Sequence, residues 1–250
     1  MIRILTTLLL SSSALLQADS LQEGIDTFRK GYRNWDSATL WNATRDFQKA
    51  VKAKPKSAQA HYWLGTAHFH RMLQIESRPT TKKLEKAAKG DREDAIEALQ
   101  DAVELDDSLA EAHAMLGTLY GMKIDGITSG MRYGRRVKKH QELALKHGKD
   151  NPRVQYLLGV ALLKTAENHA DRKKALEALH KARELYEAEA KKARGKDEPA
   201  WGRDACLAFI GKAYSELHNA GKARVYYRKA LAVRPNNKMA KKGLANLDGG

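Results

Sequence analysis

The sequence predicts an all-α protein, a solenoid of about five helical hairpins with insertions in the middle repeats and a C-terminal capping helix. One reason is a recurring glycine, spaced by 34, 52, 42 and 52 residues, which is 34 plus insertions of 0, 18, 8 and 18. A second is a recurring Ala-x3-large-x2-Ala motif. A third is composition, because 42% hydrophobic and 30% charged residues exclude a disordered chain. The glycines are Gly31, Gly65, Gly117, Gly159 and Gly211, and the motifs begin at Ala43, Ala95, Ala175 and Ala223.

Small residues at these positions allow the two antiparallel helices of a hairpin to approach closely, while the larger apolar residues interlock. Each hairpin then leaves an apolar face open, and the next hairpin covers it. The pattern therefore predicts hairpins that stack one on another. The alternative is a non-repetitive bundle in which the spacings coincide by chance.

This spacing resembles the tetratricopeptide repeat (TPR), in which Trp-x2-Leu-Gly-x2-Tyr precedes Ala-x3-Phe and then Pro within 34 residues. The first and last copies fit best, since their alanine motifs hold an aromatic residue and end at Pro55 and Pro235. The resemblance implies a right-handed solenoid within residues 19–250. The implied repeats are approximately 24–57, 58–109, 110–151, 152–203 and 204–237, with a cap at 238–248. The chain departs from the family at the tryptophan position, which holds Thr27, His61, His113, Gln155 and Leu207.

Insertions lengthen the middle repeats. The second repeat gains 18 residues, roughly 70–91, and we expect Gly90 to end a short helical turn and Asp91 to cap the next helix. The third repeat gains 8 residues within 121–134, where four glycines predict a loop. In the fourth repeat we expect the trailing helix to extend through 185–192.

Residues 1–18 have the pattern of a secretory signal peptide. Arg3 precedes an apolar run that ends at Leu16, and small residues follow, with cleavage expected after Ala18. A bilayer-spanning helix needs about 20 apolar residues, so this run is short for a permanent anchor. The sequence thus predicts a periplasmic or secreted protein without a transmembrane span after cleavage.

The sequence offers little support for a catalytic or metal-binding site. A single cysteine, Cys206, excludes a disulfide scaffold and a multi-cysteine metal site. His61, His68 and His70 form the densest histidine cluster, but spacings of seven and two do not bring ligands together on one helix face. We find no triad order, glycine-rich phosphate loop or paired carboxylates. We therefore expect no enzyme activity, no cofactor and no metal.

Charge predicts an anionic partner. The chain has 45 Lys and Arg against 30 Asp and Glu, a formal net charge of +15. An exported chain seldom meets nucleic acid, so we expect the anionic partner to be of another kind. The strongest basic run is predicted to form an anion-binding rim, with a solvated helix face as the alternative. It comprises Arg132, Arg135, Arg136, Lys138 and Lys139.

The TPR resemblance also implies a concave groove, lined by the leading helices, that binds a peptide. The positions that face the groove hold aromatic and mixed polar residues rather than the Lys and Asn that clamp a carboxylate tail, so we expect aromatic anchoring. The alternative is a groove filled by the N-terminal segment or the insertions. The predicted groove residues are Tyr62, Thr66, Phe69, His70, Thr118, Met122, Tyr156, Val160 and Lys164.

From these observations we expect a non-enzymatic protein-interaction scaffold of the cell envelope, with a peptide or protein bound in the groove. Two alternatives remain open. One is a basic module that docks on an anionic envelope surface of lipid headgroups or polysaccharide. The other is an accessory solute-binding protein of a transporter, which requires a preformed pocket.

Overall fold

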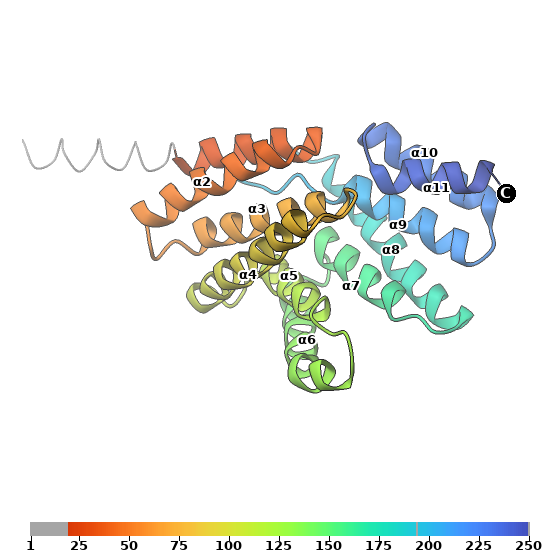
Figure 1. Cartoon of the computed structure of the whole chain (residues 1–250), viewed down its shortest axis with the longest axis horizontal. Helices are drawn as coiled ribbons and strands as arrows, with labels where there is room; N and C mark the ends of the chain where they lie inside the picture. Colours follow the sequence, from red (N-terminus) through yellow and green to blue (C-terminus); the bar gives the residue numbers. More distant parts are fainter. Residues whose placement is uncertain (1–19, 194, 250) are drawn as a thin grey trace, which may run out of the picture. The chain divides into compact units, whose positions relative to one another are not determined.

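The computed structural model describes residues 20–193 and 195–249, and within them regular structure is entirely helical. The predicted signal peptide, residues 1–18, lies outside this part. The chain divides into two compact units, Met1–Asp107 and Ser108–Gly250 (Figure 1). This division falls two residues before the position, between residues 109 and 110, at which the sequence predicts the third repeat to begin. The predicted all-α solenoid of helical hairpins is confirmed.

Unit 1 contains two helical hairpins. A helix over residues 20–34 precedes α2, Ser37–Ala53, and the second hairpin pairs α3, Ala58–Glu76, with α4, Lys82–Leu105. Each of the three labelled helices begins where a side-chain oxygen accepts a backbone N–H of the first turn, which satisfies a donor that the helix itself leaves unpaired. The capping residues are Asp36, Ser57 and Thr81.

Glycine allows α3 and α4 to touch. A Cβ atom at Gly65 would lie 2.5 Å from Cγ of Leu99 and 3.2 Å from the carbonyl oxygen of Ala95. Leu99 and Ala95 belong to the alanine motif, so the repeated glycine and the repeated motif meet at one helix crossing. Trp63 packs in the same core, completely buried.

The expected helix stop at Gly90 and the N-cap at Asp91 were wrong. α4 begins at Lys82 and continues through both residues, and Thr81 supplies its cap by accepting the N–H of Leu84 at 3.3 Å. The Asp91 side chain is buried and holds side chains of α3 instead. The insertion therefore lengthens both helices of the hairpin and leaves only residues 77–81 as a loop.

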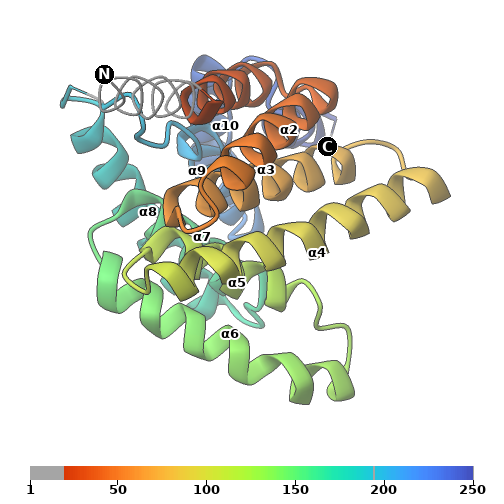
Figure 2. The ribbon, with the colours of Figure 1, turned by 90° about the vertical axis from the view of Figure 1, so that its left-hand side faces the viewer.

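Unit 2 contains three hairpins and a final helix, shown in green to blue in Figures 1 and 2. The hairpins are α5 with α6, α7 with α8, and α9 with α10, and the final helix α11 packs on α10 as a cap. Successive hairpins also touch, through α5 with α7 and α8 with α9. The bounds are α5 Ala110–Gly121, α6 Ile127–Gly148, α7 Pro152–Lys164, α8 His169–Glu189, α9 Arg203–Glu216, α10 Ala220–Val233 and α11 Lys238–Asp248.

The loop predicted within 121–134 is shorter than expected. α6 starts at Ile127, so only residues 122–126 connect it to α5. The hydroxyl of Ser129 accepts the N–H of Gly126 at 3.0 Å, which caps the helix. The ring of Tyr133 also stacks on Tyr120 of α5, with centroids 6.1 Å apart. Packing and capping thus outweigh the low helix propensity of the glycines.

None of the helices in the described part of the chain is both long and apolar enough to cross a bilayer. α6 and α11 lie at opposite ends of unit 2 in both views (Figures 1 and 2). Within unit 2 this arrangement leaves the outer side of α6 without a covering helix, whereas α7 to α10 each have neighbours on both sides along the stack.

Candidate protein-binding surfaces

The basic run of the sequence lies along the exposed side of α6, and we call it the basic face of α6. Its five cations all reach solvent, and they are Arg132, Arg135, Arg136, Lys138 and Lys139. Within the described residues, a carboxylate approaches this face at Lys138, where Glu142 lies 3.9 Å away and both side chains are largely exposed. Such a pair neutralises little charge. The face therefore keeps a strong positive potential.

Two apolar side chains adjoin these cations. Ile127 is 85% exposed and Met131 is 72% exposed. They are four residues apart, so they lie on the same side of the helix, and Arg135 continues the row four residues later. Exposed apolar side chains that are bordered by charged or polar groups are typical of interaction surfaces.

The opposite side of α6 anchors it to α5. His140 is buried, and its Nδ1 atom lies 3.0 Å from Nδ1 of His113. Burial lowers the pKa of His140 to about 4, with further contributions from His113, Lys139 and Arg136. The imidazole is consequently neutral at pH 7. The charge of the basic face comes from lysine and arginine side chains.

The predicted groove residues of unit 1, Tyr62, Thr66, Phe69 and His70, are all buried. The ring of His70 lies 5.3 Å from that of Phe28, which belongs to the helix over residues 20–34. The hydroxyl of Thr66 donates to the carbonyl of Tyr62 at 2.8 Å. None of the four presents an exposed side chain, so their role in peptide binding stays a prediction.

The predicted groove residues of unit 2 differ in exposure. Thr118 of α5, Met122 directly after α5 and Val160 of α7 are half-buried, Lys164 is exposed, and Tyr156 is buried. The ring of Tyr156 packs 6.1 Å from that of Phe209 on α9, and burial raises its pKa. The Tyr156 side chain thus also serves the contact between successive hairpins.

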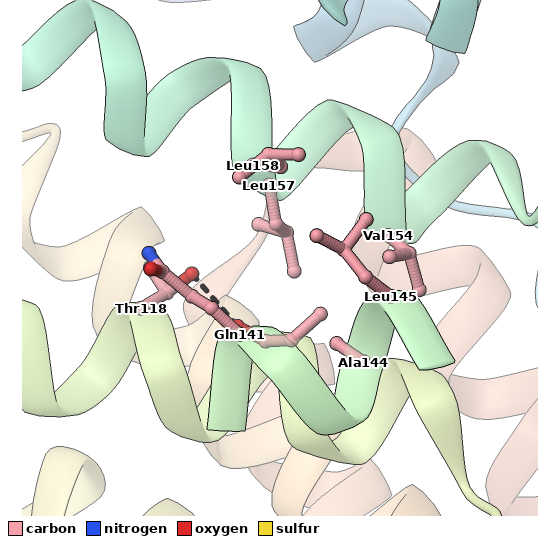
Figure 3. Close-up of a pocket in the computed structure, with 8 residues that line it drawn as sticks. Thr118, Gln141, Ala144, Leu145, Val154, Leu157 and Leu158 are labelled. Carbon is pink, nitrogen blue, oxygen red and sulfur yellow. Dashed lines mark hydrogen bonds between the residues drawn. The ribbon is translucent and has the colours of Figure 1, made fainter. Parts of the chain in front are cut away.

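Thr118 lines a small apolar cavity between α5, α6 and α7 (Figure 3). The cavity has a volume of about 10 Å³, and its walls include Leu145, Val154 and Leu157. One water molecule requires about this much space, so no larger ligand fits. The hydroxyl of Thr118 donates to the Ala114 carbonyl at 3.0 Å.

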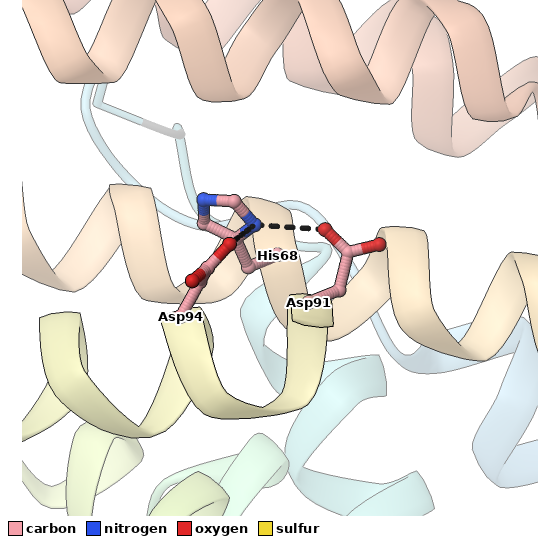
Figure 4. Close-up of side chains that lie close together, drawn as sticks. All are labelled: His68, Asp91 and Asp94. Atoms are coloured by element: carbon pink, nitrogen blue, oxygen red, sulfur yellow. Dashed lines mark hydrogen bonds and ion pairs between the residues drawn. The ribbon is translucent and has the colours of Figure 1, made fainter. Parts of the chain in front are cut away.

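An ion-pair network that the sequence did not predict lies between α3 and α4. Nδ1 of His68 lies 2.9 Å from Oδ1 of Asp91 and 3.8 Å from Oδ2 of Asp94, so three groups of metal-ligand type meet (Figure 4). Arg71 already contacts both oxygens of Asp91, at 2.5 and 2.6 Å, and its guanidinium lies 4.5 Å from the centre of the Trp41 ring.

We interpret this network as structural. A metal ion bound by Asp91 would compete with Arg71, one terminal nitrogen of which already contacts both carboxylate oxygens and neutralises the buried charge. Local spacing relates His68 only to the histidines on its own helix. Its actual partners lie more than twenty residues away on α4, and no local spacing connects them.

The single cysteine of the chain, Cys206, also serves packing. Cys206 is buried, its thiol donates to the carbonyl of Leu179 at 3.4 Å, and burial raises its pKa. A thiol that stays protonated is a poor nucleophile. His61 and His113, which occupy the tryptophan position of the repeat, are likewise buried.

Consecutive helical hairpins with glycine and alanine at their crossings define a TPR protein, a class whose members are typically non-enzymatic scaffolds for protein interactions. The TPR family model matches residues 42–72. A longer match, over residues 69–247, is to the family described as Regulator of microtubule dynamics protein 1-3. The chain belongs to this family, since the match covers more than half of its length.

Solved structures share the fold. One is a thermophilic TPR protein of Thermus thermophilus, TTC0263, with a TM-score of 0.64 and 16% identity, covering 92% of this chain and 98% of that one. Another is the HusA haemophore of Porphyromonas gingivalis, with a TM-score of 0.59 and 18% identity, covering 80% and 93%. At such identities the likeness shows the fold alone. A comparison with curated proteins found no match.

Proposed function

We propose that this protein is a non-enzymatic scaffold whose basic face of α6 binds an acidic, partly apolar segment of a protein partner. The TPR class supports a protein as the partner. The observation that carries the proposal is the set of five solvent-accessible cations on one helix, with a single long ion pair to Glu142 among the described residues. The proposed location is the cell envelope, and it rests on the sequence of residues 1–18.

Charge and apolar area contribute differently to such binding. The cations attract an acidic segment at long range, and this attraction weakens with salt because the Debye length falls from about 30 Å at 0.01 M to about 3 Å at 1 M. Burial of Ile127 and Met131 adds a contribution that salt does not screen, about 1.5–3 kcal/mol for each side chain if fully buried. The combination selects segments that carry both acidic and apolar side chains.

The predicted groove residues support peptide binding less strongly than the basic face of α6 does. Tyr62, Phe69 and Tyr156, which we expected to anchor a peptide, are buried. A ligand would have to displace packed side chains to reach them, whereas the basic face of α6 is open.

A direct test uses a fluorescein-labelled peptide of Glu-Glu-Leu repeats and the full-length chain, with binding followed by fluorescence anisotropy. The double variant Arg135→Glu/Arg136→Glu should weaken binding at least tenfold. Lys241→Glu/Lys242→Glu, which changes the exposed charge of α11 by the same amount, is the matched control and should stay within about twofold. Equal losses in both variants would show that only net charge matters and would refute the proposal.

The same variants separate a protein partner from an anionic surface. Phosphatidylglycerol vesicles replace the peptide in a co-sedimentation experiment at low and moderate salt. Binding to vesicles without binding to the peptide would overturn the protein-partner proposal in favour of a lipid surface. Peptide binding that persists at moderate salt and fails in Met131→Ser would support it, since the apolar row then contributes.

The family match favours a second candidate. The description of the family names microtubule dynamics, so the second candidate is that the basic face of α6 binds microtubules. Co-sedimentation with microtubules, lost in Arg135→Glu/Arg136→Glu and retained in Lys241→Glu/Lys242→Glu, would support this candidate. Sedimentation that is absent or equal in both variants would refute it.

A further inference from the structure

A second surface feature lies in unit 2, away from the basic face of α6. It is a pocket of about 290 Å³ between α8, α9 and α10. This volume is at the lower end of the range found for small-ligand pockets. Two of the three helices, α8 and α10, are the trailing helices of their hairpins, so the pocket is separate from the groove that the leading helices were expected to form.

Cations surround the pocket. Arg183, Arg203 and Lys229 line it together with one carboxylate, Glu187. Glu187 lies 3.8 Å from the guanidinium of Arg183, and Glu184 accepts a hydrogen bond from the same guanidinium at 3.0 Å. The Nε atom of Arg183 is buried and makes no hydrogen bond within the described structure. Arg203 and Lys229 are exposed and have no carboxylate within 4 Å in the described residues, so the pocket retains positive charge.

The floor of the pocket is apolar and preformed. The apolar wall that a ligand can reach is formed by Ala232 and Val233 of α10, which are exposed, while Leu207 of α9 and Tyr186 of α8 line the pocket as buried side chains. The Tyr186 hydroxyl donates to the carbonyl of Trp201 at 3.3 Å, which fixes the orientation of the ring. A ligand therefore meets an apolar wall that needs no rearrangement.

We propose that this pocket binds a small amphipathic carboxylate, with its apolar group against Ala232 and Val233 and its carboxylate toward Arg203 and Lys229. The planar arginine fork matches the two oxygens of a carboxylate, and the volume admits one ring system or a short alkyl chain. Neutral molecules of the same shape gain only the apolar contact. This site is independent of the partner proposed for α6.

The test compares two probes of nearly equal shape, 2-naphthoate and 2-naphthol, on the full-length chain by isothermal titration calorimetry. Naphthoate should bind about tenfold more tightly than naphthol, because only the carboxylate gains charge-assisted hydrogen bonds. Arg203→Gln and Lys229→Gln should each weaken naphthoate binding about threefold and leave naphthol binding unchanged. Both side chains are exposed, so neither change should unfold the protein.

Arg228→Gln is the matched control, since Arg228 is a cation of α10 beside Lys229 that does not line the pocket. It should leave naphthoate binding within twofold. The inference is overturned if naphthol binds as tightly as naphthoate, if Arg228→Gln has the same effect as Lys229→Gln, or if naphthoate does not bind at millimolar concentrations. Substitution of Val233 by Trp should block both probes by filling the pocket.

Discussion

Arg153 joins three helices of unit 2. It lies at the start of α7, and its side chain is 6% exposed. The Nε atom donates to Glu111 of α5 at 2.6 Å, and the two terminal nitrogens donate to Glu189 of α8 at 2.6 and 3.2 Å. Burial by itself would lower the pKa of Arg153, but the two glutamates more than offset this and raise it. The guanidinium is therefore always charged and holds the two repeats together.

Replacement of Arg153 by methionine should destabilise unit 2 by about 3 kcal/mol. Removal of one partner of a buried ion pair usually costs about 3–5 kcal/mol, because the remaining charge stays buried without compensation. Here two carboxylates are left, with Glu111 11% and Glu189 21% exposed. Their partial exposure places the expected loss at the lower end of this range. Methionine keeps most of the apolar volume, so the loss reports the charge rather than a cavity.

Urea unfolding followed by far-ultraviolet circular dichroism measures this change, with Arg172→Met as control. Arg172 pairs with Glu216 at 3.6 Å, and both side chains are more than a quarter exposed, so its loss should cost less than about 1 kcal/mol. Adding Glu111→Gln and Glu189→Gln to Arg153→Met should recover part of the lost stability. An Arg153→Met variant within about 1 kcal/mol of the unchanged protein would refute the reasoning.

Two further predictions concern helix contact and acid stability. Gly65→Ala should lower the stability of the protein by about 1–3 kcal/mol, since the new Cβ would lie 2.5 Å from Cγ of Leu99. Gly90→Ala places its Cβ where no atom lies within 4 Å, so it should stabilise α4 by about 0.5–1 kcal/mol. Thermal unfolding would distinguish the two variants, and equal shifts in melting temperature would contradict the prediction. His140 stays neutral in the folded protein down to about pH 4 but takes up a proton near pH 6.5 when unfolded, so stability should fall as the pH drops between these values. The free energy of unfolding should fall by about 2 kcal/mol over this range, after allowance for solvent screening. Urea unfolding of His140→Gln at several pH values tests this cause, and a pH dependence of stability equal to that of the unchanged protein would contradict it.

The candidate surfaces were predictable from the sequence only in part. Five cations within eight residues predicted the anion-binding rim, and all five reach solvent on α6. The sequence did not predict the exposed Ile127 and Met131 as partners of this charge, because the segment was expected to be a loop. Helical spacing brings them beside Arg135 only once α6 extends to Ile127.

The sequence by itself determined the helical hairpins, because the spacing of glycine, alanine and large apolar residues acts within one hairpin. Local chemistry likewise determined most helix starts, such as Ser57 and Asn168. Tertiary structure decided where side chains from different helices meet. Asp91, which local rules assign to a helix cap, lies inside α4 because the helix already begins at Lys82, and its buried carboxylate pairs with Arg71 and His68 of α3. Burial and pairing depend on residues far apart in the chain, and no local pattern contains that information.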